Sequence, residues 1–335
     1  MGLTPAYRIE VNGKDITSKL RERLLALTVE DRAGISSDNV ELMLDDAGEN
    51  LAFPPLGAEI SVSLGYLETG VADKGKYVID EVECQGPPSV MVVRGKAADM
   101  NKGLKIPKTR TWQHSGIPPS PYRLQTLLST IAAEHGLIPV LGKEFESTGY
   151  SVVHQSNESD LQLLTRLGRK LDAVAKPVNG YLIIAKRGQA RSASGQAMPF
   201  DTFTKQDLLI WRCSAVQRER YAAVRARYQD TATAKEQTVM EGQGKPVFTI
   251  RALHKNKQEA WLSAKAQLAA FARGERLVEL TLLGYPALAA EQGMILTGIR
   301  DGVDGEWVIE EVVHQLSGDG FVTQVYGVQK QGEIR

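Results

Sequence analysis

Histidine and cysteine are the residues in this chain best suited to bind a metal ion or act as nucleophiles. The five histidines are spread along the sequence: His114, His135, His154, His254 and His314. No two of them stand at metal-ligand spacing from each other or from a cysteine. The two cysteines, Cys84 and Cys213, form no C-x-x-C pair. We therefore expect surface or packed histidines, no disulfide framework, and synthesis in a reducing cytoplasm.

The chain holds no complete catalytic or phosphate-binding motif. The stretch Gly242-Gln243-Gly244-Lys245-Pro246 resembles part of a phosphate loop, but it has Pro where Ser or Thr must bind magnesium. No G-x-S-x-G or G-x-G-x-x-G occurs. A peptidoglycan hydrolase would need an acid pair or a metal, and 40 carboxylates give no basis for choosing one pair. We predict no catalytic, cofactor-binding or metal-binding residue, and a protein that is not an enzyme.

Arginines gather in one stretch that is rich in strand-forming residues. They are Arg212, Arg218, Arg220, Arg225 and Arg227. One interpretation is a positive lumen or partner contact that touches DNA or a tape-measure protein. The other, which we favour, is a solvated strand face with acids nearby. Lys plus Arg equals Asp plus Glu, 40 against 40, so no global field attracts nucleic acid or an anionic membrane.

Bulk properties indicate a globular chain with two or three cores. It has 335 residues, of which 42% are apolar and 24% charged. The start has no apolar stretch typical of a secretory signal, and position 6 is Ala, which argues against myristoylation. No apolar run approaches the roughly 20 residues of a membrane helix, so we expect no stable membrane insertion.

The first part of the chain, to about residue 98, predicts a β-sandwich or barrel. Short strand-like runs alternate with turn signals such as Asn12-Gly13. These runs are 7–11, 25–30, 40–44, 60–64, 77–82 and 90–93. Extended structure returns around 208–211, 222–228 and 247–250, after an expected loop at 186–205.

The middle of the chain changes to helical periodicity. We expect one helix capped by Ser120 with Pro121 first, and stopped by Gly136. A second has Asn157 and Asp160 in capping-box spacing and leads to a hairpin. A third should run from Lys257 to Arg273.

The third helix is capped by Asn256 and Glu259 and stopped by Gly274. Its expected apolar face holds Trp261, Ala264, Leu268 and Phe271. A second extended region then follows, from Leu277 to Val328.

Two short sequences recur at the two ends of the chain. The stretch 75–82, GKYVIDEV, returns as 305–312, GEWVIEEV, and 40–44, VELML, returns as 278–282, VELTL. The matches occur in the same order with similar gaps. We infer a duplicated structural unit and, from it, symmetry.

The repeated strand carries acids on both faces. Tyr77, Ile79 and Glu81 should share one side, because side chains alternate along a strand. Glu311 breaks the alternation at the matched place in the second copy. These acids are either solvated edge residues or equivalent contacts in a larger ring.

The chain resembles the late control protein D family, the baseplate hub of contractile-tailed phages. The resemblance rests most on Ser159–Leu167 and Gly305–Phe321, and more loosely on Asp31–Gly34 and Leu51–Gly57. It is similar as well to the hub part of VgrG-type spike proteins. The resemblance implies an α+β, mainly β fold with two similar β-barrels joined by a small α/β module with two to three amphipathic helices. The barrels would be residues 1–100 and 205–335, the second with the helix 257–273 inserted, and the module with its linker 101–204.

The same resemblance implies a role in assembly. Three chains would form a ring of six barrels that adapts a sixfold tail tube to a threefold spike. Partners would be a separate spike, since no room for one follows the second barrel, the tube protein, and tape-measure and baseplate wedge proteins. DNA would pass without tight binding. The location would be the virion tail baseplate, assembled in the host cytoplasm.

Two other functions stay open from the sequence. The first is a tail-associated peptidoglycan hydrolase that uses an exposed acid pair. The second is the hub of a toxin-delivery injection system, because the same fold would serve both machines.

Overall fold

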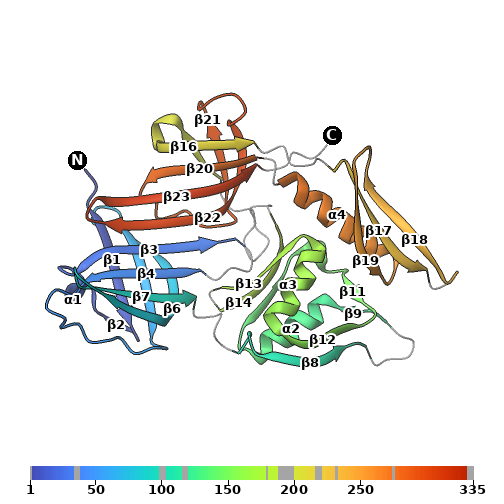
Figure 1. Cartoon of the computed structure of the whole chain (residues 1–335), viewed down its shortest axis with the longest axis horizontal. Coiled ribbons are helices and arrows are strands. Elements are labelled where there is room, and N and C mark those ends of the chain that lie inside the picture. The colour runs from blue at the N-terminus through green and yellow to red at the C-terminus, as the bar shows by residue number, and fades with distance from the viewer. Residues whose placement is uncertain are drawn as a thin grey trace.

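The computed structural model describes nine stretches of the chain. Thirteen of the described strands belong to one sheet, and Figure 1 shows how the elements are arranged. The described residues are 2–33, 38–97, 103–114, 120–178, 180–187, 200–215, 221–230, 233–273 and 276–329. The fold is α+β and mainly β, as expected. Gly34, Gly274, Arg218 and Arg220, on which expectations were placed, lie outside these residues.

The first β-unit is formed by the N-terminal strands and one short helix. Its sheet order is β3-β4-β7-β6-β5-β1-β2, all antiparallel. The elements are β1 (Pro5–Val11), β2 (Lys14–Asp15), α1 (Thr17–Leu20), β3 (Leu24–Arg32), β4 (Asn39–Asp45), β5 (Glu59–Tyr66), β6 (Gly70–Gln85) and β7 (Val90–Ala97). Each of the six expected runs is a strand, and Asn12-Gly13 forms the predicted turn, with positive φ at both residues.

The second β-unit has strands from the C-terminal part of the chain. Its sheet order is β16-β20-β23-β22-β21-β15. The elements are β15 (Phe200–Thr204), a 3-10 turn η3 (Lys205–Asp207), β16 (Leu208–Ala215), β20 (Arg276–Leu283), β21 (Gly293–Thr297), β22 (Gly305–Ser317) and β23 (Gly320–Gln329). The expected loop 186–205 therefore ends in a strand, because β15 pairs in parallel with β21.

The α/β module lies beside the first β-unit (Figure 1). Its elements are β8 (Pro107–Trp112), β9 (Tyr122–Arg123), α2 (Leu124–Glu134), β10 (Ile138–Leu141), η2 (Lys143–Phe145), β11 (Gly149–Tyr150), β12 (Val153–Ser159), α3 (Asp160–Leu171), β13 (Ala173–Val178) and β14 (Tyr181–Lys186). The apolar faces of α2 and α3 form one core, in which Leu124, Leu128, Leu163 and Leu164 are fully buried. The predicted helix–hairpin order is present.

Two predicted helix caps are wrong. The N-cap of α2 is Arg123 and not Ser120, because Tyr122–Arg123 pairs with β11 before the helix starts. The N-cap of α3 is Ser159, whose hydroxyl accepts from Gln162 N while the Gln162 side chain accepts from Ser159 N. The true signal was therefore Ser-x-x-Gln.

The α4 module consists of a three-stranded sheet covered by one helix. It is made of β17 (Ala223–Asp230), β18 (Lys235–Gly242), β19 (Val247–His254) and α4 (Lys257–Arg273). The helix has the predicted bounds, and Asn256 Oδ1 accepts from Glu259 N at 2.8 Å. Ala264 packs inward, whereas Trp261 is 40% exposed, so the predicted apolar face is narrower than expected. These strands do not join the main sheet.

Each β-unit has its own apolar core. Ile9, Val62 and Leu64 are fully buried in the first unit. Trp307, Ile309 and Val325 are fully buried in the second. The described part of the chain has no helix long and apolar enough to cross a bilayer.

Candidate assembly interface

The histidines and the turn that resembles a phosphate loop lie in different parts of the fold. His114 and His154 are exposed, whereas His254 and His314 are buried in different modules. The turn Gly242–Pro246 joins strands β18 and β19 and opens no helix, so it cannot cradle phosphate as a phosphate loop does.

One cluster that the sequence did not reveal surrounds Asp160. Ligand atoms of Glu134, His135 and Asp160 lie within 4.8 Å of one another. Asp160 is fully buried, and its oxygens accept from Lys108 (2.7 Å) and His135 (2.9 Å) and from the Arg110 guanidinium.

Hydrogen bonds decide the charge of this cluster. Burial alone would raise the pKa of Asp160, but the hydrogen bonds that it accepts, with His135, Lys108 and Gln155 foremost, hold this pKa at about 2. Two fixed cations already neutralise the carboxylate. This arrangement is that of a structural ion-pair network, which joins β8 to the start of α3.

The structure separates the arginines that the sequence placed together. Arg212 lies on β16 of the main sheet, with Glu279 Oε2 3.6 Å away. Arg225 and Arg227 lie on β17 of the α4 module, where Arg227 pairs with Glu236. The three arginines thus lie on two different sheets, and Arg212 and Arg227 each have an acid nearby.

The repeated sequences occupy equivalent places in the two β-units. Strand β6 lies between β5 and β7, and β22 lies between β21 and β23. Tyr77 and Trp307 are both buried, and the Tyr77 hydroxyl and the Trp307 indole N–H each donate to a backbone carbonyl three or four residues upstream. The equivalent strands run in the order β3-β4-β7-β6 and β16-β20-β23-β22, and each set forms a ladder of four strands.

A shared bulge explains the imperfect alternation. On β6 the register with β7 shifts between Ile79 and Glu81. On β22 the register with β23 shifts between Ile309 and Glu311. Each strand thus inserts one extra residue, an acid, and the inward positions change parity after it.

A second bulge is duplicated at the other edge of each ladder. The register of β3 on β4 shifts between Leu24 and Ala26, and that of β16 on β20 shifts between Leu208 and Ile210. This third repeat is not apparent from the sequence, because its two copies share only the double leucine.

Two glycines opposite the first bulge complete the match. A Cβ on Gly95 would meet Val78 O at 3.1 Å and Val40 Cγ1 at 3.2 Å, and one on Gly327 would meet the matched atoms of Val308 and Val278, each at 3.2 Å. The same close backbone approach therefore occurs in both ladders.

The repeated acids do not make equivalent contacts within one chain. Glu81 lies 3.2 Å from Arg94 of its own unit and its side chain is 58% exposed. Glu311 lies 3.0 Å from Arg32 of the other unit and its side chain is 27% exposed. Each acid is therefore ion-paired, and only Glu311 bridges the two units.

The two β-units meet edge to edge through strands β22 and β3. Their antiparallel register runs from Glu311 opposite Arg32 to Ser317 opposite Ala26. Leu316 packs in the core of the first unit. We call this contact the internal seam, and it makes the two ladders one continuous sheet of eight strands (Figure 1).

A polar contact between Lys74 and His314 links the two units at the internal seam. The Lys74 ammonium donates to the carbonyls of Pro286 and Leu288, and its Nζ lies 2.9 Å from His314 Nε2. His314 Nδ1 lies 3.0 Å from Thr323 Oγ1, and His314 Nε2 also lies 3.1 Å from the Leu288 carbonyl oxygen.

The Lys74–His314 contact opposes a positive charge on His314. Burial, reinforced by the positive charge of Lys74, lowers the pKa of His314 to about 3. Burial also lowers the pKa of Lys74 to about 8. The seam therefore holds a neutral imidazole at neutral pH.

Comparisons with known proteins agree with this architecture. No family model matches the chain. A probable baseplate hub protein of Escherichia phage 186 is 26% identical, and one of Escherichia phage P2 is 25% identical; both matches cover 96% of this chain and 92% of the relative.

Solved structures share the fold over nearly the whole chain. The tail protein from Neisseria meningitidis MC58 superposes with a TM-score of 0.73 at 12% identity, over 97% of each chain. A component of the Escherichia coli type VI secretion system gives 0.55 at 10% identity, over 97% of this chain and 77% of that one.

Proposed function

We propose that this chain, a relative of the baseplate hub proteins of P2-like phages, is the structural hub subunit of a contractile tail or tail-like particle. The observation that carries the proposal is the pair of equivalent four-strand ladders, with the same strand order and the same two bulges. A structural subunit acts through its surfaces, and this chain presents the same four-strand ladder in each of its two β-units.

In this proposal each β-unit, with its own core, is one barrel. In the first unit β5 and β1 extend the ladder beyond β6, and in the second β21 and β15 extend it beyond β22. The division expected from the resemblance is retained as part of the proposal: barrels at 1–100 and 205–335, with the α/β module and linker at 101–204 between them. The α4 module is then an insertion in the second barrel.

The assembly we propose is a homotrimeric ring. Closed rings need repeated compatible surfaces. Two equivalent units in each of three chains provide six similar positions, which suits a sixfold tail tube on one side. The threefold symmetry of the ring suits a spike on the other side.

The partners follow from that geometry. They are a separate spike protein and the tail tube protein, with tape-measure and baseplate wedge proteins as further contacts. DNA would cross the ring without tight binding, because the chain has no net charge and several of its arginines, among them Arg32, Arg94 and Arg227, pair with acids. The place of action is the baseplate of the virion, after assembly in the host cytoplasm.

The role we propose is not enzymatic. A hollow of about 250 Å³ lies between α3 and α4, and Glu259 is the only carboxylate among the described residues that line it. Glu259 is paired with Lys170 at 2.9 Å. A glycoside hydrolase needs two carboxylates across its cleft, so clearing of a peptidoglycan suspension by the purified protein would contradict this role.

A hub of a toxin-delivery system is the second candidate. The observation that favours it is the shared fold with the type VI secretion component. The sequence relatives are phage proteins, which favours the tail.

The mass of the assembly tests the proposal. One chain has a mass of 36.6 kDa, and sedimentation equilibrium of the purified protein should give three times this value as concentration rises. A strict monomer at the highest soluble concentration would contradict the hub function.

A further inference from the structure

The eight strands of the two joined ladders begin and end at strand edges that pair with no other described strand over part or all of their length. Strand β16 pairs with β20 on one side only. Beyond its bulge, β6 pairs with β7 only, over Glu81–Gln85. The matched strands in the other unit, β3 and β22, are paired on both sides. Figure 1 shows β16 and β6 at opposite rims of the stack of strands.

The internal seam shows what these two edges are built to do. In that seam β22 of the second unit pairs with β3 of the first. Strand β6 is the counterpart of β22, and β16 is the counterpart of β3, as the duplicated bulges establish. Each chain therefore carries a second pair of strands, β6 and β16, that correspond to the two strands of the internal seam. These two strands do not pair with each other within the chain.

We propose that β6 of one copy pairs with β16 of a neighbouring copy in the antiparallel register of the internal seam. This contact, the external seam, rests on the proposed function, since it is the contact that closes the ring of copies. An exposed strand edge is a template for such pairing. The partner is a second copy of this chain.

The register of the external seam follows residue by residue from the bulges. Glu81 corresponds to Glu311, and Leu24 corresponds to Leu208. The pair His314–Val29 of the internal seam then becomes Cys84 opposite Cys213 of the neighbouring copy. The chain has two cysteines, and a register derived without them places them face to face.

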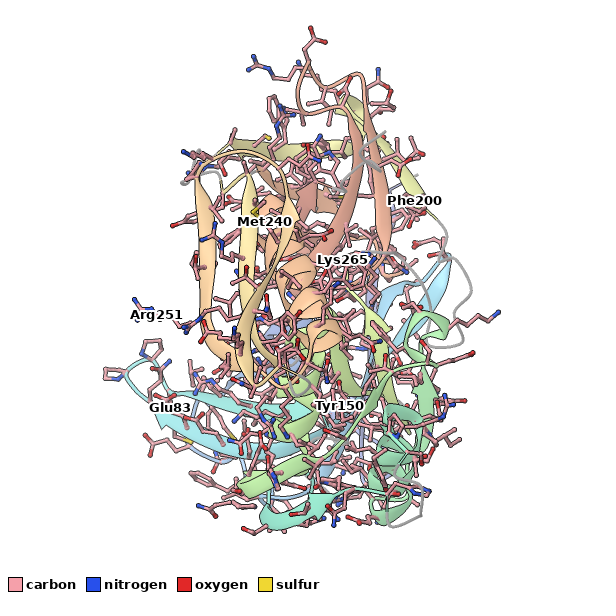
Figure 2. All side chains as sticks on the ribbon, turned by 90° about the vertical axis from the view of Figure 1, so that its right-hand side faces the viewer. Glu83, Tyr150, Phe200, Met240, Arg251 and Lys265 are labelled. Atoms are coloured by element: carbon pink, nitrogen blue, oxygen red, sulfur yellow. The ribbon has the colours of Figure 1, made fainter. Side chains whose placement is uncertain are left out.

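The exposure of these residues fits an interface. His314 and Val29, which meet across the internal seam, are each 1% exposed. In the single chain Cys84 is exposed and Cys213 is partly exposed, against the core of the second unit. Figure 2 shows Glu83, the residue before Cys84, on a hairpin that projects from the body of the molecule.

The hydrogen-bonding groups of β16 point the right way. In the internal seam Ala33 N donates to Glu310 O at 2.7 Å. Donors alternate along an antiparallel strand, so Asp31 N faces β22 as well. The counterpart of Asp31 is Ala215, whose N–H therefore points away from β20 and toward the neighbouring copy.

The external seam should be weaker than the internal one. Leu316 fills the core of the first unit at the internal seam. Its counterpart is Gly86, directly after β6, which has no side chain to bury. The internal seam is thus fixed within the chain, and the external one forms only when copies meet.

Cross-linking of the cysteines tests the register. The wild-type protein at the concentration of the trimer is treated with a short bismaleimide, to which each thiol adds across one double bond. Directly opposed residues on antiparallel strands are about 5 Å apart at Cα. We expect dimers and trimers on a denaturing gel and a linked peptide pair that contains Cys84 and Cys213.

Serine variants provide the matched controls. Cys84→Ser and Cys213→Ser should each abolish the cross-link when alone. An equal mixture of the two variants should restore it but give dimers only, because each chain then carries one thiol.

A backbone variant tests the same seam without thiol chemistry. Ala215→Pro removes the outward N–H and leaves the β16–β20 ladder intact, since proline is tolerated at a strand edge. Ser214→Ala is the control. The proline variant should keep the circular dichroism spectrum of the wild type. It should need at least about tenfold more protein to assemble, because it loses one hydrogen bond to the neighbouring copy and its pyrrolidine ring would clash with that strand.

The outcomes separate this inference from the proposed function. A trimer that gives no Cys84–Cys213 link, or that assembles equally well with Pro at position 215, overturns the external seam and leaves the hub function standing. A protein that stays monomeric overturns both.

Discussion

Protonation of His314 should weaken the internal seam at acid pH. The imidazole is 1% exposed and its Nε2 lies 2.9 Å from the Lys74 ammonium. The pKa of His314 is about 3 in the folded chain, against 6.5 for an ordinary histidine. Between these values the unfolded chain binds the proton and the folded chain does not, so stability falls as pH falls.

The size of the effect follows from those two values. Below pH 6 each unit of pH costs about 1.4 kcal/mol from this one group. Between pH 6 and pH 4 the free energy of unfolding should therefore drop by about 2 to 3 kcal/mol because of His314. This loss continues down to about pH 3, where the folded chain begins to take up the proton.

The assay compares the wild type with His314→Gln, which has no charge to gain. Urea unfolding at pH 6, 5 and 4 gives the free energy of each protein, and the difference between them removes the contribution of all other groups. The wild type should lose about 2 to 3 kcal/mol relative to the variant over this range. His154→Gln, at an exposed histidine, is the control and should show a constant difference. A difference for His314→Gln that does not change with pH would refute the reasoning.

Two further substitutions test the duplicated ladder and the buried ion cluster. Gly327→Ala should destabilise the chain by about 1 to 3 kcal/mol in thermal or urea unfolding, because its Cβ would lie 2.7 Å from Met294 Cε and 3.2 Å from both Val308 O and Val278 Cγ1. Gly318→Ala, with no atom within 4 Å, should change stability by less than about 0.5 kcal/mol. Equal effects would contradict the close approach. Asp160→Asn should cost about 2 to 4 kcal/mol at pH 7, because it leaves the partly buried Lys108 and Arg110 without their counter-charge. The stabilisation of the fold by the Asp160 carboxylate should be present above about pH 4. It should vanish as pH falls toward 2, where Asp160 takes up its proton in the folded state.

The sequence revealed the duplication but not its register. Tyr77 and Trp307 could be matched by eye, because the residues around them are the same or similar. The bulges could not be read directly, since an extra residue in a strand is defined by the strand opposite. The only sign of the bulge in the repeated strand is that acids fall on both faces, a pattern that also fits solvated edge residues or contacts in a ring.

Long-range contacts were the part that sequence patterns could not reach. His135 and Asp160 meet from different elements, and β3 meets β22 across most of the chain. Local propensity describes neighbours along the chain and says nothing about such pairs. The cap of α3 was within reach, because Ser159 and Gln162 form an ordinary capping box that Asn157 obscured.

The resemblance and the fold reinforce each other for a physical reason. A duplicated ladder is the simplest way for one chain to offer the same edge twice. The internal seam shows that the two copies of the ladder fit edge to edge, and the unpaired edges of β16 and β6 leave room for the same fit between chains.

Electron micrographs of the purified protein test the central claim most directly. Averaged end views should show a ring with a central opening and six similar lobes, arranged with threefold symmetry. Averages that show single bodies, or pairs without an opening, would contradict the account.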